Sequence, residues 1–193
     1  MDALKRAALP DALKVPGSLV AKYPLEIVQV AHTQADVLLV SEYDSRMIGR
    51  PWLTIALDVA TRCVLSFYVS IDRPGAATMG LLMTRAALCK RSWLEKIEVD
   101  AEWLMRGIPQ VLHLENVAEF KSWALRSDCR EYGIHLMYRP VRRPHFGGHI
   151  ERFNRTLMER VRGLPGETGS SPKGCKARQS EKTAALTPRE FEQ

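Results

Sequence analysis

Apolar runs of strand length come first along the chain, and segments of helical periodicity follow them. Residues 25–40 (LEIVQVAHTQADVLLV) are rich in β-branched and apolar side chains, which favours a strand. Residues 51–71 (PWLTIALDVATRCVLSFYVSI) predict two strands joined at residues 60–62. The first half of the core is therefore expected to form three antiparallel strands.

The second half alternates helices with short strands. Residues 74–91 carry Met79, Leu82, Met83, Ala86 and Cys89 at helical spacing behind a Pro-Gly start, and residues 92–109 are irregular. The remaining elements are a strand ending at Leu114, a helix at 117–133, a strand at 134–140, a loop at 141–148 and a helix at 149–163. Crossover connections make the last two strands parallel. The order predicts an α/β fold with a ribonuclease-H-like mixed five-stranded sheet flanked by helices.

The segments outside this pattern suggest an arm and a tail. Residues 1–24 contain Pro10, Pro16 and Pro24 and predict an N-terminal arm before a core at 25–163. Residues 164–193 begin as a flexible basic linker rich in Gly, Ser and Pro. Thr187, Pro188 and Glu190 then have the spacing of a helix N-terminus. This start of a further segment leads us to expect a fragment of a longer protein.

Composition and charge indicate the kind of binding partner but not the reaction. A net charge of +6 and a pI near 9.3 favour a polyanionic partner. No signal peptide or membrane-spanning run is present in the sequence, so a cytoplasmic location is expected. The four cysteines form no C-x-x-C pair, which argues against a zinc site or a disulfide framework.

Two acidic residues lie at the ends of predicted elements. Glu115 ends a predicted strand and Glu151 lies near the start of the last helix, with 35 residues between them. In the predicted order these two places are neighbours. A third carboxylate is expected from the middle of the first strand, because hard ions such as Mg²⁺ need several oxygen ligands.

Four motifs together resemble a known family. They are VQVAHTQADVLLV, GRPWLTIALDVATRCVLSFYVS, VLHLENVAEF and YRPVRRPHFGGHIERFNRTLMERV. With the 35-residue spacing, they resemble the DDE transposases and retroviral-type integrases. The tail motifs LPG and EKTAALT look like bacterial multi-domain transposases related to the Mu group. The resemblance implies Mg²⁺- or Mn²⁺-dependent DNA strand cleavage and strand transfer, with transposon ends and target DNA as partners and self-association in a transposition complex.

The chain departs from the family pattern at two of three acidic positions. The resemblance implies Asp at position 31, where this sequence has Ala31, and Asp at position 115, where it has Glu115. Glu151 matches. We expect Ala31, Glu115 and Glu151 to mark the catalytic positions, with Glu115 and Glu151 as ligands of a weak, incomplete metal site and activity strongly impaired. Asp36 faces away on an extended strand, and Asp58 is better explained as a structural acid before a turn.

Basic side chains near Glu151 are the predicted DNA contacts. If the last helix starts at His149, its buried stripe is Ile150, Phe153, Leu157 and Val161, and Glu151, Arg155, Met158 and Arg162 lie on an adjacent face. Arg155 has two interpretations of nearly equal weight, a phosphate contact or an ion pair with Glu151 or Glu159. Arg142, Arg143 and Arg162 complete the predicted DNA-binding set.

Other interpretations stay open or are set aside. A non-catalytic DNA-binding or assembly module is the alternative function, which Ala31 and Glu115 favour. A nuclease for RNA in hybrids shares the fold but fits the flanking motifs less well. His145 and His149 lack a third ligand for zinc, and His32 and His113 are expected to make strand-end hydrogen bonds.

Overall fold

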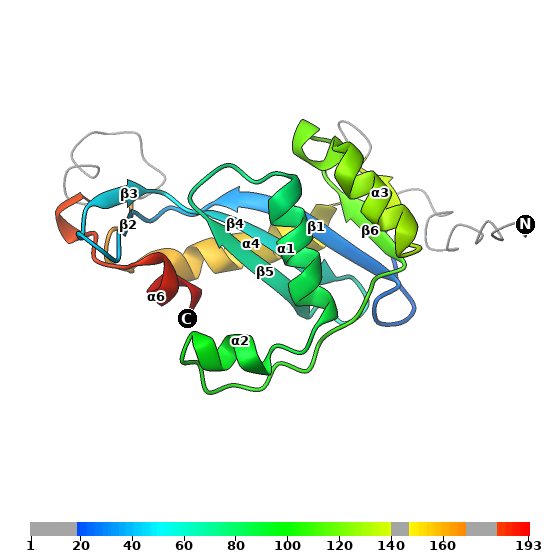
Figure 1. The fold of residues 1–193 in the computed structure, drawn as a ribbon, viewed down its shortest axis with the longest axis horizontal. Coiled ribbons are helices and arrows are strands. Elements are labelled where there is room, and N and C mark those ends of the chain that lie inside the picture. The colour runs from blue at the N-terminus through cyan, green and yellow to red at the C-terminus, as the bar shows by residue number, and fades with distance from the viewer. Residues whose placement is uncertain (1–18, 140–146, 169–180) are drawn as a thin grey trace, which may run out of the picture.

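A five-stranded mixed sheet forms the centre of the molecule in the computed structural model, which describes residues 19–139, 147–168 and 181–193 (Figure 1). The strand order is β5-β4-β1-β6-β7. The antiparallel part consists of β1 (Ile27–Gln34), β4 (Trp52–Asp58) and β5 (Val64–Ser70). The strands β6 (Val111–Leu114) and β7 (His135–Tyr138) run parallel to β1. This topology confirms the predicted ribonuclease-H-like sheet.

The apolar run at 25–40 is not one strand, which corrects the sequence prediction. The strand β1 ends at Gln34, and β2 (Leu39–Val40) pairs with β3 (Met47–Gly49) in a separate two-stranded sheet. Asp36 forms an ion pair with Arg50 at this break. The buried residues beyond the break pack against the end of the last long helix instead of a neighbouring strand of the main sheet.

Helices cover both faces of the sheet. The helices α1 (Ala76–Ala87) and α3 (Trp123–Glu131) lie on one face, and α4 (Gly148–Val161) lies on the other (Figure 1). The short helix α2 (Arg91–Lys96) occurs in a segment predicted to be irregular. The helix α3 starts later than predicted because a 3₁₀ turn (Ala118–Lys121) precedes it and Ser122 caps it, accepting a hydrogen bond from the Leu125 amide at 3.2 Å.

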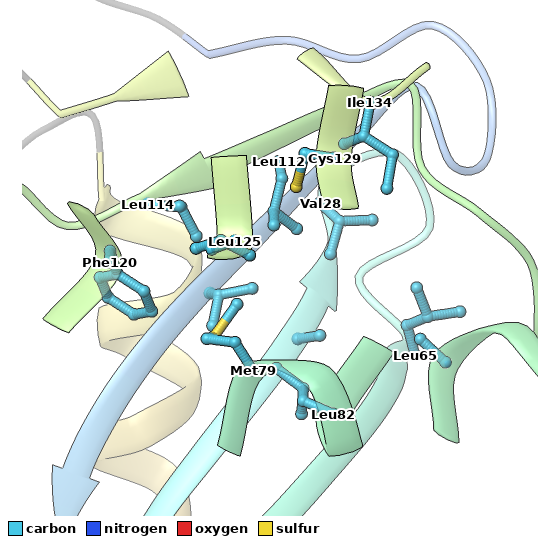
Figure 2. Packing of buried hydrophobic residues seen from close by; sticks show 13 residues of the cluster. Val28, Leu65, Met79, Leu82, Leu112, Leu114, Phe120, Leu125, Cys129 and Ile134 are labelled. Atoms are coloured by element: carbon cyan, nitrogen blue, oxygen red, sulfur yellow. The ribbon is translucent and has the colours of Figure 1, made fainter. Parts of the chain in front are cut away.

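The buried side chains of β1 alternate between these two helical layers. Val28 and Val30 join the main cluster with α1 and α3, part of which Figure 2 shows. Ala31 points to the opposite face and packs in a cluster with Ile150 of α4. Met158, predicted on the face adjacent to the buried stripe of the last helix, packs against the buried clusters on this side.

Residues beyond the predicted core contact the segment just before β2 and the end of α4. The Leu38 amide donates to the Gly166 carbonyl at 2.9 Å, beside a bridge between Val37 and Glu167. The helix α6 (Pro188–Glu192) has the predicted start, since Thr187 and Glu190 form a reciprocal capping box. Within the described ranges, no helix is long and apolar enough to cross a membrane.

Candidate active site

Three residues form a row across neighbouring parallel strands. Val30 of β1 pairs with Leu114 of β6, and Leu114 pairs with Tyr138 of β7, so these three residues are level with one another across the sheet. The next residues along the three strands are Ala31, Glu115 and Arg139. The Arg139 amide donates to the Leu114 carbonyl at 2.9 Å and extends the ladder by one bond. Alternation along the strands directs this row toward the face that α4 covers.

The first turn of α4 brings Glu151 to the same row. The Nη1 atom of Arg139 lies 3.1 Å from Oε1 of Glu151 and 3.5 Å from Oε1 of Glu115. The Arg139 side chain is 10% exposed, compared with 30% for Glu115 and 47% for Glu151. Gly147 lies directly against this ion pair, and a side chain at that position would collide with both Arg139 and Glu151. One partly buried guanidinium therefore joins both predicted acids.

Position 31 contributes no oxygen to this cluster. Ala31 is 1% exposed, and its methyl group packs against Ile150 and neighbouring apolar side chains. The Nε and Nη2 atoms of Arg139 are buried and have no hydrogen-bond acceptor among the residues that the structure describes. Among the described residues no three His, Cys, Asp or Glu side chains gather to hold a metal ion. The residues present thus do not fit the pair of divalent ions that the family resemblance implies.

Arg139 is the site residue that the sequence analysis missed. Its position contains a usable signal, since it follows β7 directly, as Glu115 follows β6. Residues at the carboxyl ends of adjacent parallel strands meet at one edge of a sheet, and a charged residue there is a candidate for the same reason as Glu115.

A buried polar pair lies under the acids. The Gln29 side chain hydrogen-bonds Nδ1 of His113 through its Nε2 atom at 3.2 Å, and its Oε1 atom accepts from the Ile150 amide at 3.3 Å. Burial, reinforced by the charge of Arg139, lowers the pKa of His113 to about 4. His113 makes a hydrogen bond as expected, but it lies inside β6 rather than at the strand end. His32 bonds the Thr54 hydroxyl at 2.8 Å.

The other predicted residues are distributed as follows. Arg155 is exposed on α4, whereas Arg162, predicted on the same helix, is an exposed residue just after its end. In the part of the chain that is described Glu151 pairs with Arg139 rather than with Arg155. Arg142, Arg143 and His145 lie outside the described residues. Asp58 is fully buried and accepts hydrogen bonds from the Leu25 amide and from the amide and hydroxyl of Thr61, at 2.7–2.8 Å. It is the structural acid that its position before a turn predicts.

Comparison with known proteins places this chain in a family. Residues 29–166 match the family described as the TnsB C-terminal domain. The chain is 30% identical over 144 residues to the transposase for transposon Tn552 of Staphylococcus aureus, covering 72% of this chain and 28% of the relative. It is 29% identical over 136 residues to the transposon Tn7 transposition protein TnsB of Escherichia coli, covering 67% of this chain and 19% of that relative. The chain thus spans less than a third of either relative.

Two solved structures illustrate the similarity in chain trace. A chain in the structure of a simian T-cell lymphotropic virus intasome in complex with a PP2A regulatory subunit matches with a TM-score of 0.49 and 15% identity, covering 82% of this chain and 47% of that chain. The HTLV-2 integrase catalytic core domain in complex with magnesium matches with a TM-score of 0.42 and 14% identity, covering 82% of this chain and 84% of that chain.

Proposed function

The chain belongs to the family of TnsB C-terminal domains, and from this membership and the site geometry we propose that it is a DNA strand-transfer domain with a dismantled metal centre. It is expected to retain the scaffold of the transposase and integrase core and to cleave and join DNA strands poorly or not at all. The sequence relatives support the transposase part of this proposal. The residues around Arg139 support the loss of activity.

The observation that carries the proposal is the ion pairing of Arg139 with both acids. Two carboxylates that lie close together repel each other, and in this chain the positive charge of the Arg139 guanidinium reduces that repulsion. At an effective dielectric of about 20, unit charges ~4 Å apart interact by about 4 kcal/mol, so a divalent ion entering beside Arg139 would be repelled strongly. Ala31 adds no acid that offsets this repulsion.

DNA is the proposed partner. The exposed Arg155 lies one turn after Glu151 on α4, and the exposed Arg162 directly follows the last residue of that helix, so both guanidinium groups are proposed to contact phosphate oxygens. The net charge of +6 favours the same partner. We also propose that the domain associates with other copies or subunits in a transposition complex, as the resemblance implies.

A second candidate is a non-catalytic DNA-binding or assembly module. The ion pairing favours it, since the positive charge of Arg139 offsets one of the two carboxylate charges and so reduces the local repulsion of a phosphate backbone. In this alternative the domain contacts DNA or neighbouring subunits without chemistry. The two candidates share the binding surface and differ in whether restoring the acids restores a metal site.

Calorimetric titration with Mn²⁺ tests the proposal. The unaltered chain is compared with the double variant Ala31→Asp/Glu115→Asp, and only the double variant is expected to bind Mn²⁺ clearly. Adding Glu151→Gln to the double variant should abolish that binding, which shows that the acids at these positions are the ligands. Mn²⁺ binding by the unaltered chain with the same affinity as the double variant would contradict the proposal of a dismantled centre.

A further inference from the structure

The start of α4 lacks a cap from its own N-terminal residue. The first amides of a helix have no partner within the helix, and a side chain at the N-cap position usually accepts from one of them. The N-cap residue of α4 is Gly147, which has no side chain to do so. The Ile150 amide instead donates to Oε1 of Gln29, a residue more than a hundred positions earlier in the chain. A strand side chain thus caps this helix.

The direction of each hydrogen bond follows from this contact. The Ile150 amide can only donate, so the oxygen of the Gln29 amide faces α4 and the nitrogen faces His113. The Gln29 nitrogen can only donate, so Nδ1 of His113 must be the acceptor. The neutral imidazole therefore carries its proton on Nε2, and both side chains are fully buried in this arrangement.

The three residues lie next to the three site positions. Gln29 precedes Ala31 by two residues and His113 precedes Glu115 by two, so each shares a sheet face with its neighbour. Ile150 directly precedes Glu151. The chain of hydrogen bonds therefore connects the three elements β1, β6 and α4 just below the point where their site residues meet.

We propose that Gln29 and His113 are positioning residues that cap α4 from the sheet and thereby set where Glu151 meets Glu115 and Arg139. Gln29 holds the helix start through the Ile150 amide, and His113 fixes the orientation of the Gln29 amide group. The inference rests on the proposed function only in treating positions 31, 115 and 151 as one site. The capping itself is a property of the unaltered chain and is measured there.

Hydrogen exchange of single amides tests the cap. The Leu125 amide is a matched control, since it is the third residue of α3 and is capped locally by Ser122, whereas Ile150 is the third residue of α4. In Gln29→Met, which keeps the side-chain length without either hydrogen bond, exchange of the Ile150 amide is expected to accelerate about tenfold relative to that of Leu125. Equal acceleration of both amides, or none at Ile150, would overturn the proposal.

Variants at His113 separate positioning from packing. Asn can present an acceptor oxygen where His113 has Nδ1, whereas Leu fills the space without one. His113→Asn is expected to keep the protection of the Ile150 amide, and His113→Leu to lose it. Protection kept in His113→Leu and lost in His113→Asn would mean that His113 acts only by filling volume.

Two further measurements keep the proposal testable if a variant fails to fold. Nitrogen-15 chemical shifts of His113 in the unaltered chain should show a proton on Nε2 and none on Nδ1, and the opposite tautomer would refute the assignment. In the Ala31→Asp/Glu115→Asp background, adding Gln29→Met should weaken Mn²⁺ binding about tenfold. Absence of Mn²⁺ binding before that addition would count against the proposed function, while the exchange results would still decide the cap.

Discussion

The guanidinium of Arg139 lies 3.1 Å from the carboxylate of Glu151, and the same nitrogen lies 3.5 Å from Glu115. Residues from the end of a strand and the start of a helix therefore form one charged cluster. The cluster places a fixed cation beside two predicted metal ligands, and two buried donor atoms of Arg139 have no acceptor within the described part of the chain. An Asp at position 31 would add acceptor oxygens to the row formed by residues 31, 115 and 139.

Replacing Arg139 tests whether it competes with a metal ion. In the Ala31→Asp/Glu115→Asp background, Arg139→Gln should strengthen Mn²⁺ binding about tenfold, because the like charge of the guanidinium is removed. Calorimetry measures the affinity. Weaker binding in the triple variant would show that Arg139 supports the acids instead of competing with the ion.

The exposed Arg155 on α4 and the exposed Arg162 just after it should contribute to DNA affinity. Removing one arginine that binds a phosphate reduces the slope of log K against log salt by about 0.9 for duplex DNA. Arg155→Gln/Arg162→Gln is therefore expected to lower the slope by up to about 2, as measured by fluorescence anisotropy at several salt concentrations. Arg126→Gln is the control, since this exposed arginine lies on α3 on the other face of the sheet. Equal slopes for all three proteins would contradict the proposed role of Arg155 and Arg162 in binding DNA.

Asp58 should matter for stability and not for metal binding. Asp58→Asn removes the charge and one acceptor oxygen from a fully buried group that accepts hydrogen bonds from Leu25 and Thr61. The free energy of unfolding is therefore expected to fall by about 2 kcal/mol. Urea denaturation measures this change. Mn²⁺ binding of the Ala31→Asp/Glu115→Asp background should be unaffected by adding Asp58→Asn. Loss of that binding in a folded variant would make Asp58 a ligand.

Two glycines should respond to alanine in opposite directions. Gly166 has φ +85°, and an added Cβ would lie 2.6 Å from the Leu38 carbonyl oxygen, so Gly166→Ala is expected to destabilise the fold by about 2 kcal/mol. Gly80 is exposed within α1 and has open space around it, so Gly80→Ala should stabilise by about 0.5–1 kcal/mol. Denaturant unfolding curves of the two variants test this contrast, and the same sign for both would refute the role assigned to the backbone at Gly166.

Lys90 should make stability depend on pH in alkaline solution. Its ammonium group is buried against the carbonyl oxygens of Ala86, Leu88 and Met105, and burial lowers its pKa from 10.5 to about 8. The unfolded chain therefore binds more protons than the folded chain between pH 8 and 10.5, so this residue makes stability rise with pH across that window.

The variant Lys90→Met isolates this effect. The free energy of unfolding of the unaltered protein, measured relative to that of Lys90→Met, is expected to increase by about 1–2 kcal/mol from pH 8 to 10.5, with screening taken into account. A difference between the two proteins that stays constant across this range would show that the Lys90 pKa is not lowered by folding.

Local sequence determined most of the fold. The two strands at 51–71, the short strand ending at Leu114 and the capped start at Thr187 follow from alternation and capping residues, which act over a few positions. The same patterns misplaced the end of β1 and the start of α3. Both boundaries depend on partners distant in the chain or on a 3₁₀ turn that periodicity does not reveal.

The sequence by itself also determined that position 31 offers no oxygen and that Glu115 and Glu151 belong to neighbouring element ends. Only the tertiary structure decided that Arg139 joins these two acids and that Gln29 caps α4. Both features arise from parallel pairing of β1, β6 and β7 and from the docking of α4 on the sheet. Contacts between residues so far apart in the chain depend on strand register and helix placement, which local propensity does not specify.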